Sequence, residues 1–268
     1  MIRETEYPSL GVALSGGGAR GIAHVGVLHA FDEHGIRPCC ISGSSIGAIV
    51  GAFYAGGMQP LEMLELLSGK GFLNLFRLKP SLSGFLEMRY LQKVLDEHLP
   101  DTFEELKIPL FVCATNLSKG KSEIFHKGEL ASPIIASSSI PILFEPVELG
   151  GCKYVDGGVL NNLPVDGCRK ISDHLVGVEV NQGKFTQNLR TMKNVALEVF
   201  HLVVNKNSDE GMKQCDSVII PEMENSFDLL DFSKAKKLFD KGYEAGLNWV
   251  ASYQDFHKTR ITQSITIK

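Results

Sequence analysis

The chain alternates short apolar runs with longer segments in which apolar residues recur every three or four positions. Leu10 to Leu14 is a short apolar run, and Gly21 to His34 then carries apolar residues at helical spacing. Pro38 to Ser42 repeats the short run, and Ile46 to Ala55 is rich in small and apolar residues. Short continuous apolar runs are typical of buried strands, and longer periodic segments are typical of helices. Residues 10–55 therefore predict strand, helix, strand and helix.

The same alternation continues along the rest of the chain. It predicts further strands at Pro109–Asn116, Leu175–Val180 and Ser217–Ile220, and a hairpin formed by Val147–Leu149 and Cys152–Val155. It predicts helices near Pro60–Leu67, Tyr90–His98, Leu130–Ser138, Asn188–Val204 and Lys234–Val250. Alternating strands and helices favour an α/β fold, here a three-layer α/β/α arrangement with a largely parallel central sheet. Because no linker or repeat divides residues 1–268, we predict a single domain.

A glycine-rich turn joins the first predicted strand to the first helix. It reads Gly16-Gly17-Gly18-Ala19-Arg20-Gly21 and offers several backbone N–H donors. Its glycines also satisfy the Gly-x-Gly-x-x-Gly pattern of dinucleotide-binding folds. Those folds place an acidic residue about 20 positions further on, where it binds the ribose hydroxyls. The segment from Cys39 to Ser44 has no acidic residue, which favours an oxyanion-stabilising loop and leaves dinucleotide binding as the alternative.

A second glycine-framed turn joins the second strand to the second helix. It reads Gly43-Ser44-Ser45-Ile46-Gly47 and places Ser45 at the corner. In a nucleophile elbow the serine backbone is strained, and the positions two before and two after it approach too closely for side chains. The amide after Ser45 and the start of the helix place positive partial charge where an oxyanion would form. The turn predicts a serine nucleophile, with an ordinary tight turn as the alternative.

A serine nucleophile needs a base, and the best candidate is an aspartate. The predicted hairpin ends at Asp156-Gly157-Gly158, where the glycines let another backbone come close to the carboxylate. Histidine is the usual base of serine hydrolases. None of the histidines after Ser45 lies in a glycine-rich corner, and we interpret His126 and His174 as ordinary surface or strand-edge residues.

Three blocks in this order resemble the patatin-like phospholipase family. They are the glycine loop, the Ser45 corner, and Asp156-Gly157-Gly158 preceded by the segment from Ala136 to Pro146. The resemblance spans about residues 9 to 180, and three ordered motifs are much more specific than one. We expect residues 181–268 to complete the same domain with further helices and strands.

The resemblance implies a Ser-Asp dyad without a catalytic histidine. Ser45 would be the nucleophile and Asp156 its general base. The implied oxyanion hole consists of Gly16, Gly17, Gly18 and Ala19, and the supporting motif residues are Arg20, Gly21, Gly43, Gly47, Gly157 and Gly158. The implied reaction is hydrolysis of carboxylic esters of phospholipids, lysophospholipids or acylglycerols through an acyl-enzyme, without a metal or other cofactor.

Two other functions stay open at this point. A non-catalytic module would use the same pocket to bind a lipid or a partner, and an acyltransferase would pass the acyl group to an alcohol other than water. An aspartate with a solution pKa near 4 is a weak base toward an alcohol. The hydrolase therefore requires a poorly solvated site that raises the pKa of Asp156.

Charge patterning bears on the partners. The formal net charge is −4, so the overall field gives no reason to expect nucleic acid binding. Residues 70–89 combine four cations with interleaved aromatic and aliphatic residues. Apolar residues at this density more often belong to the core, and peripheral contact with an anionic bilayer, through the apolar groups and the cations, is the alternative. Met1 to Glu6 lack an apolar signal core, and no uninterrupted apolar run is long enough to span a membrane, so we expect a cytoplasmic protein.

Three further features receive structural interpretations. Arg20 lies at the positive end of a helix dipole, so we expect its guanidinium to bond loop carbonyls, with contact to an anionic head group as the alternative. The six cysteines lack metal-ligand spacing and are interpreted as small buried thiols. The apolar face of Asn188–Val204 is interpreted as core. No EF-hand loop suggests calcium dependence, and the oligomeric state cannot be inferred.

Overall fold

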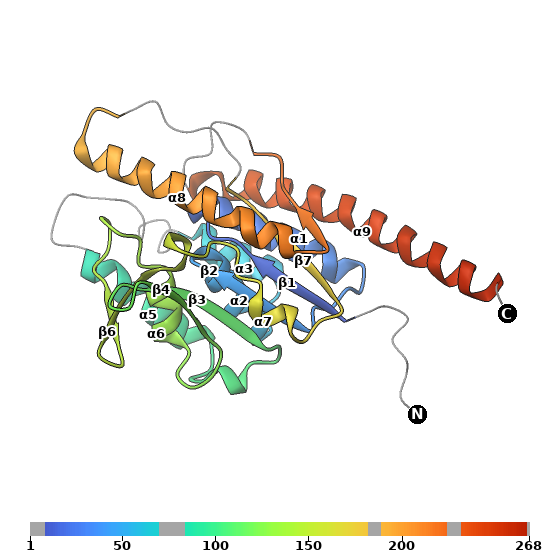
Figure 1. The fold of residues 1–268 in the computed structure, drawn as a ribbon, viewed down its shortest axis with the longest axis horizontal. Helices are drawn as coiled ribbons and strands as arrows, with labels where there is room; N and C mark the ends of the chain where they lie inside the picture. Colours follow the sequence, from blue (N-terminus) through green and yellow to red (C-terminus); the bar gives the residue numbers. More distant parts are fainter. Residues whose placement is uncertain (1–8, 70–83, 182–188, 224–231, 267–268) are drawn as a thin grey trace.

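The structure, a computed structural model, describes residues 9–69, 84–181, 189–223 and 232–266 (Figure 1). Its strands are β1 (Leu10–Leu14), β2 (Cys40–Ser44), β3 (Leu110–Asn116), β4 (Lys121–Phe125), β5 (Val147–Leu149), β6 (Cys152–Asp156), β7 (His174–Val178) and β8 (Ser217–Ile219). They form an eight-stranded sheet in the order β5-β6-β3-β2-β1-β7-β8, with β4 paired to β3. In this order the neighbouring strands β3, β2, β1, β7 and β8 are parallel to one another. Strands β4, β5 and β6 are antiparallel to their neighbours.

Helices cover both faces of the sheet (Figure 1). The α-helices are α1 (Ile22–Glu33), α2 (Ile46–Gly56), α3 (Pro60–Ser68), α5 (Gly84–His98), α6 (Ala131–Ser137), α7 (Asp166–Arg169), α8 (Met192–Gln214) and α9 (Ala235–Thr266). The 3-10 helices are η1 (Gly18–Gly21), η2 (Phe103–Glu105), η3 (Gly157–Val159) and η4 (Phe232–Lys234). The predicted α/β fold with a largely parallel central sheet is confirmed.

Alternation along β1 shows how the two layers of helices are packed. Val12 and Leu14 belong to the main core, together with apolar residues of α1, α2, α3 and α9. Ala13 points to the other face, where it packs with Leu163 and Cys168 in a smaller cluster next to α7. Successive strand side chains point to opposite faces, so this central strand is apolar throughout because both of its faces are covered.

Some element bounds differ from the sequence prediction. β4 was not predicted, because its residues are exposed or half-buried at the edge of the sheet and lack an apolar run. α8 continues to Gln214 and α9 to Thr266, beyond the predicted ends at Val204 and Val250. The polar second half of α8 is held by a narrow buried face that includes Ser208 and Gly211. Small residues of this kind do not register as hydrophobic periodicity.

The prediction that the apolar face of Asn188–Val204 belongs to the core is wrong. The side chains on that face, Leu189, Met192, Val195, Val199, Leu202 and Val203, are all exposed. α8 contacts the body instead through its opposite side, where His201, Val204 and Ser208 are buried. The helix therefore carries apolar residues on two sides, and only one of them is covered by described residues.

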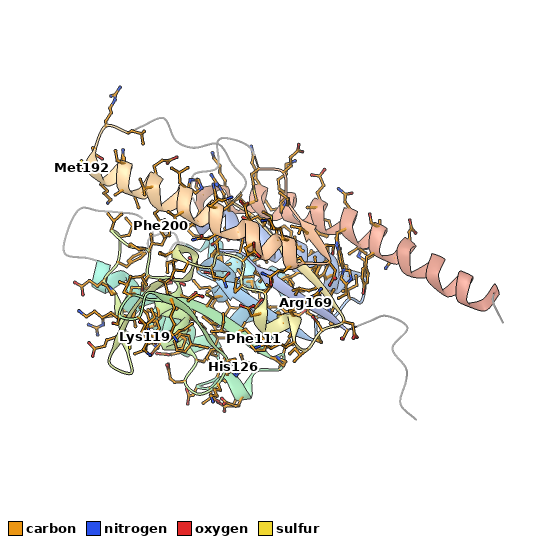
Figure 2. All side chains as sticks on the ribbon, viewed as in Figure 1. Phe111, Lys119, His126, Arg169, Met192 and Phe200 are labelled. Carbon is orange, nitrogen blue, oxygen red and sulfur yellow. The ribbon has the colours of Figure 1, made fainter. Side chains whose placement is uncertain are left out.

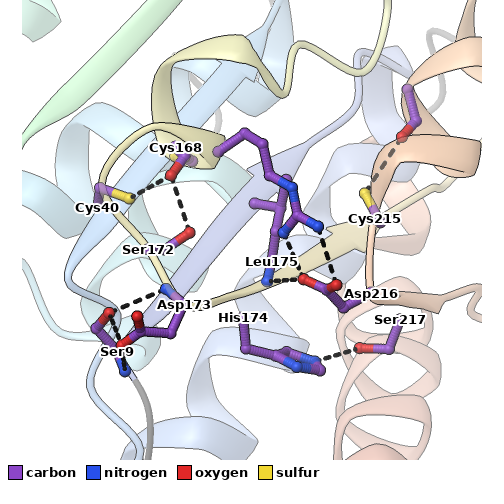
Figure 3. A network of polar contacts seen from close by, with 12 residues as sticks. Ser9, Cys40, Cys168, Ser172, Asp173, His174, Leu175, Cys215, Asp216 and Ser217 are labelled. Carbon is purple, nitrogen blue, oxygen red and sulfur yellow. Dashed lines mark hydrogen bonds and ion pairs between the residues drawn. The ribbon is translucent and has the colours of Figure 1, made fainter.

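Hydrogen bonds and an ion pair connect the segments at one end of the sheet, where β1 and β7 begin (Figure 3). Ser9 Oγ donates to Asp173 Oδ2 at 2.7 Å, and Arg169 Nη2 donates to Asp216 Oδ1 at 2.9 Å. His174 Nε2 lies 3.1 Å from the Ser217 hydroxyl. The loops that follow β1 and β2 emerge at the other end of the sheet.

All six cysteines are free thiols, and Cys40, Cys113 and Cys168 are buried. Cys40 Sγ lies against the Cys168 carbonyl (Figure 3). Most of the segment 70–89, namely residues 70–83, lies outside the described residues. Its burial in the core and its contact with a bilayer therefore both stay predictions. Within the described parts of the chain, no helix has both the length and the apolar character needed to cross a membrane.

Candidate active site

The sheet brings the ends of β2 and β6 together beside β3. Cys113 of β3 pairs with Ser44 at the end of β2, and the next residue, Ala114, pairs with Asp156 at the end of β6. β4 occupies the opposite edge of β3 at both positions, so β2 and β6 share one edge. Because β2 is parallel and β6 antiparallel to β3, they approach from opposite directions. Ser45 and Asp156 therefore leave the sheet at the same place.

Ser45 lies at a strained corner between β2 and α2. Its φ of 53° and ψ of −126° fall in a region that non-glycine residues rarely adopt, at a typical cost of about 1–3 kcal/mol. A Cβ on Gly43 would lie 2.4 Å from the Gly47 carbonyl carbon, and a Cβ on Gly47 would lie 2.4 Å from the Leu14 oxygen. Both glycines are therefore required for the close approach of the backbones around Ser45.

Ser137, at the end of α6, holds the backbone of this corner. Its Oγ accepts a hydrogen bond from the Ser45 N–H at 2.9 Å and donates to the Cys113 carbonyl at 2.6 Å. Ser138 and Ser139 donate instead to carbonyls one turn earlier in α6. A single hydroxyl thus connects α6 and β3 to the strained residue.

Asp156 is 2% exposed and lies in a poorly solvated position. Its Oδ1 accepts from the Gly158 N–H at 2.8 Å. Burial raises the pKa of Asp156 to about 7, and the Ser45 hydroxyl and the Gly158 N–H lower this pKa by smaller amounts. The other carboxylate oxygen, Oδ2, is buried and lacks a hydrogen bond from any described residue.

The glycine loop packs directly on Ser45. A Cβ on Gly16 would lie 3.1 Å from the Ser45 Cβ. The Gly16 N–H donates to both the backbone oxygen and Oδ1 of Asn162, each at 3.1 Å. The N–H groups of Gly17, Gly18 and Ala19 donate to none of the described residues. Among the loop amides, these three are therefore available to an oxyanion, whereas that of Gly16 is engaged.

Buried polar side chains hold the glycine loop in place through hydrogen bonds. Asn181 Nδ2 donates to the Gly16 carbonyl at 2.6 Å, and Asn162 Nδ2 donates to the Ser208 hydroxyl at 2.8 Å. Glu179 Oε1 accepts from the Asn181 N–H at 2.6 Å. Burial raises the pKa of Glu179 to about 7. The loop is therefore positioned by hydrogen bonds from the segment after β7 and from Asn162 after η3, and Ser208 of α8 in turn holds Asn162.

Arg20 and His201 form a polar pair behind the loop. Arg20 Nη1 lies 3.4 Å from the Asn181 carbonyl and 3.3 Å from His201 Nε2. Arginine can only donate, so Nε2 of His201 accepts and its proton lies on Nδ1. Arg20 therefore bonds a loop carbonyl, as expected from the sequence. Its guanidinium also donates a hydrogen bond to Nε2 of His201.

Ser45 and Asp156 line one small pocket at this corner. The other lining residues are Gly16, Gly17, Gly18, Ile140, Asn162, Phe200, His201 and Val204. Its volume is about 10 Å³, close to the minimum that holds one water molecule. Three of these side chains, Phe200, His201 and Val204, come from α8, which covers the pocket.

The remaining predicted site residues surround the pocket without lining it. Ala19 and Gly21 are buried in η1, where Gly21 packs against Ile46. A Cβ on Gly157 would lie 2.2 Å from the Cys113 carbonyl, and Gly158 bonds Asp156. His126, by contrast, packs against Phe111, on the side of the molecule away from α8 (Figure 2).

Sequence reasoning missed several residues that shape the site. These are Ser137, Asn162, Glu179, Asn181 and His201. The one available signal was Glu179, a carboxylate within the apolar run from Leu175 to Val180. Among the described residues, no group of three or more histidine, cysteine, aspartate or glutamate side chains could hold a metal ion.

Comparison with known proteins identifies the family. The family model described as patatin-like phospholipase matches residues 12–169 of the chain. This range contains the glycine loop, the Ser45 corner and Asp156-Gly157-Gly158. The chain belongs to the patatin-like phospholipase family. Its match covers β1 to α7, the part of the sheet and the loops that carry the candidate site.

Relatives of this patatin-like chain include longer proteins. An uncharacterized NTE family protein of Mycobacterium tuberculosis is 34% identical over 211 residues, which are 77% of this chain and 59% of that protein. Lysophospholipase NTE1 of Scheffersomyces stipitis is 28% identical over 287 residues, covering 93% of this chain and 18% of that protein. The structure of VipD from Legionella pneumophila superposes with a TM-score of 0.56 at 17% identity, over 92% of this chain and 67% of VipD, which shows the same fold.

Proposed function

We propose that this chain is a lipid acyl hydrolase that uses Ser45 as nucleophile and Asp156 as general base. The observation that carries the proposal is the shared pocket, in which a strained serine and a buried aspartate meet beside backbone donors. Membership of the patatin-like phospholipase family supports the same reaction class.

In the proposed reaction, Ser45 Oγ attacks the ester carbonyl carbon while its proton passes to Asp156. Gly158 holds Oδ1, so Oδ2 is the oxygen that takes the proton. A pKa near 7 makes this carboxylate a stronger base than a solvated aspartate. When the tetrahedral intermediate collapses, the leaving alcohol receives that proton and an acyl-enzyme remains. Water then attacks the acyl carbon while its proton passes to Asp156. The bond to Ser45 Oγ breaks, the fatty acid leaves, and the proton returns to Oγ.

The amides of Gly17 and Gly18 are the best-placed donors for the negative charge on the tetrahedral oxygen. Removing one donor of this kind typically raises the barrier by about 3 kcal/mol. His201 is a poorer base than Asp156, although it lines the pocket, because the Arg20 guanidinium faces its Nε2. The dyad therefore needs no imidazole.

The substrate class follows from the lining and from the relatives. Ile140, Phe200 and Val204 give the pocket an apolar side suited to an acyl chain. The fungal relative is named a lysophospholipase, which makes lysophospholipids the first esters to test. Phospholipids and acylglycerols complete the panel.

A fluorophosphonate probe combined with fatty acid release tests this proposal. The probe should add covalent mass to Ser45, and the chain should release fatty acid from at least one member of the panel. Ser45→Ala should abolish both signals, and Asp156→Asn should lower kcat by at least about a thousandfold. Ser44→Ala is the matched control, because the neighbouring Ser44 Oγ has no hydrogen bond to the described residues. An unlabelled Ser45 and no hydrolysis would favour a lipid-binding module instead.

A further inference from the structure

The first half of α8 is apolar on two opposite sides. Phe200 and Val204 face the body and line the pocket, whereas the opposite side has a stripe of exposed apolar residues. This outer stripe consists of Met192, Val195, Val199, Leu202 and Val203. Met192 is 85% exposed and Val199 is 53% exposed. Figure 2 shows Met192 where α8 begins, away from the sheet, and Phe200 on the side toward the body.

The exposed outer stripe has the features of a binding surface. A surface helix of a globular protein normally has one apolar stripe, which faces the core. The outer stripe follows helical spacing, with Met192, Val195, Val199 and Leu202 three or four positions apart, so these side chains form one continuous strip. Contiguous exposed apolar strips on soluble proteins mark interaction sites.

The charges around the outer stripe indicate what the partner is. Residues 189–203, which include the outer stripe, contain two cations, Arg190 and Lys193, and one carboxylate, Glu198. Their net charge is +1 by this count, on a chain whose formal net charge is −4. Both Arg190 and Lys193 are exposed at the beginning of the helix. An apolar helical face flanked by cations is typical of helices that lie in the surface of an anionic bilayer.

The same helix also closes the candidate active site. Ser45 is 7% exposed, and the pocket of about 10 Å³ is far smaller than an acyl ester. Phe200, His201 and Val204 are the lining residues from α8. Room for an ester beside Ser45 requires some of the lining side chains to move, and α8 supplies three of them. A ligand that displaces α8 would therefore widen access to Ser45.

We propose that the outer stripe of α8 docks on the surface of an anionic lipid bilayer and that docking draws the inner face of α8 away from Ser45. The proposal rests on the proposed ester hydrolysis and adds how the lipid substrate gains access to the site. The outer stripe is exposed in the closed form and lets the bilayer dock. The bilayer then favours the open form because opening also uncovers Phe200 and Val204 of the inner face, which lipid covers better than water does.

Binding to vesicles tests the docking surface. The double variant Val199→Ser/Leu202→Ser removes the centre of the outer stripe without changing a residue that lines the pocket. The full chain should cosediment with vesicles of phosphatidylcholine and phosphatidylglycerol, more strongly than with phosphatidylcholine alone. The double variant should bind at least about tenfold more weakly. The matched control is Leu61→Ser/Ile171→Ser, which removes two similarly exposed side chains, one from α3 and one from the turn after α7. It should bind as the unchanged chain does.

Hydrolysis of a soluble short-chain ester separates this inference from the proposed function. The ester should be hydrolysed faster when anionic vesicles are added, and Val199→Ser/Leu202→Ser should lose that stimulation while keeping the rate without vesicles. If Ser45 is inert toward the fluorophosphonate and the ester, the hydrolase proposal fails, whereas the vesicle measurement still decides the docking surface.

Two outcomes would overturn the docking proposal. One is that the unchanged chain and the double variant bind vesicles equally well, or that neither binds vesicles. The other is a dimer, seen by sedimentation equilibrium, that Val199→Ser/Leu202→Ser converts to a monomer while the unchanged chain ignores vesicles. In that case the stripe would be covered by a second copy of the chain.

Discussion

The basicity proposed for Asp156 depends on how little water reaches its carboxylate. Burial favours the neutral acid and raises the pKa to about 7. The base must be ionised to accept the Ser45 proton, so kcat/KM should rise with pH and reach half its maximum near 7. The measurement is a pH profile on a neutral short-chain ester, which has no titrating group of its own.

Replacing His201 provides the control for that profile. His201→Ala removes the imidazole that lines the pocket. The variant's kcat/KM should still rise with pH and reach half its maximum near pH 7. If His201→Ala abolished this rise, or if the rise lay near pH 4 in the unchanged chain, Asp156 would not be the titrating base.

Ser137 provides a second prediction at the scale of single residues. Ser137→Ala leaves the Ser45 N–H and the Cys113 carbonyl without their shared partner. A buried group without a partner costs about 1–3 kcal/mol, and we expect a fall in kcat of about 10- to 100-fold with little change in KM. Steady-state kinetics of Ser137→Ala beside Ser138→Ala checks this, because the Ser138 hydroxyl bonds only within its own helical turn. Equal kinetics for the two variants would refute a positioning role for Ser137.

The elements that could be predicted from the sequence are those buried on both faces. β1 and α2 lie within a residue or two of their predicted bounds. Their residues are almost all apolar, so the ends of the apolar runs mark the ends of the elements. β4 has no such signal. For α8, periodicity predicted a helix but placed its apolar face in the core, because a pattern reports that a face is apolar and not what covers it.

The site was predictable where steric demands fix the residue type. Glycines mark both loops because side chains cannot fit there. The register that places Asp156 one position beyond Ser44 along β3 involves three distant segments, and no local pattern encodes it. The same holds for Asn162, whose bonds to Gly16 cross most of the chain.

α8 carries the prediction at the scale of elements. Phe200→Ala shortens a side chain that lines the pocket, and it should open the site without lipid. We expect fluorophosphonate labelling of Ser45 in buffer to accelerate by roughly three- to tenfold, as expected when a closed form restricts access. Val199→Ala, one position away on the outer stripe, should label at the original rate. Unchanged labelling by Phe200→Ala, with the variant folded by circular dichroism, would show that α8 does not limit access.

Across the whole molecule, the two ends of the sheet respond to pH in opposite ways. Where β7 begins, Arg169 lowers the pKa of Asp216 to about 2, so this contact adds stability that is lost as the pH falls from about 4 to about 2. Where β6 and β7 end, burial raises the pKa values of Asp156 and Glu179 to about 7. These two carboxyls are protonated in the folded chain over a range in which the unfolded chain has released its protons.

That difference predicts that stability falls as the pH rises. Between about pH 4 and 7 the unfolded state binds fewer protons than the folded state, so the free energy of unfolding decreases by up to about 1.4 kcal/mol per pH unit for each group. Glu179→Gln resembles the protonated side chain and removes one of the two contributions. Urea unfolding at pH 5 and pH 8 should therefore show a smaller difference for Glu179→Gln than for the unchanged chain. The exposed Glu244→Gln variant should keep the full difference, and an equal loss in both variants would place the pH sensitivity outside this buried carboxyl.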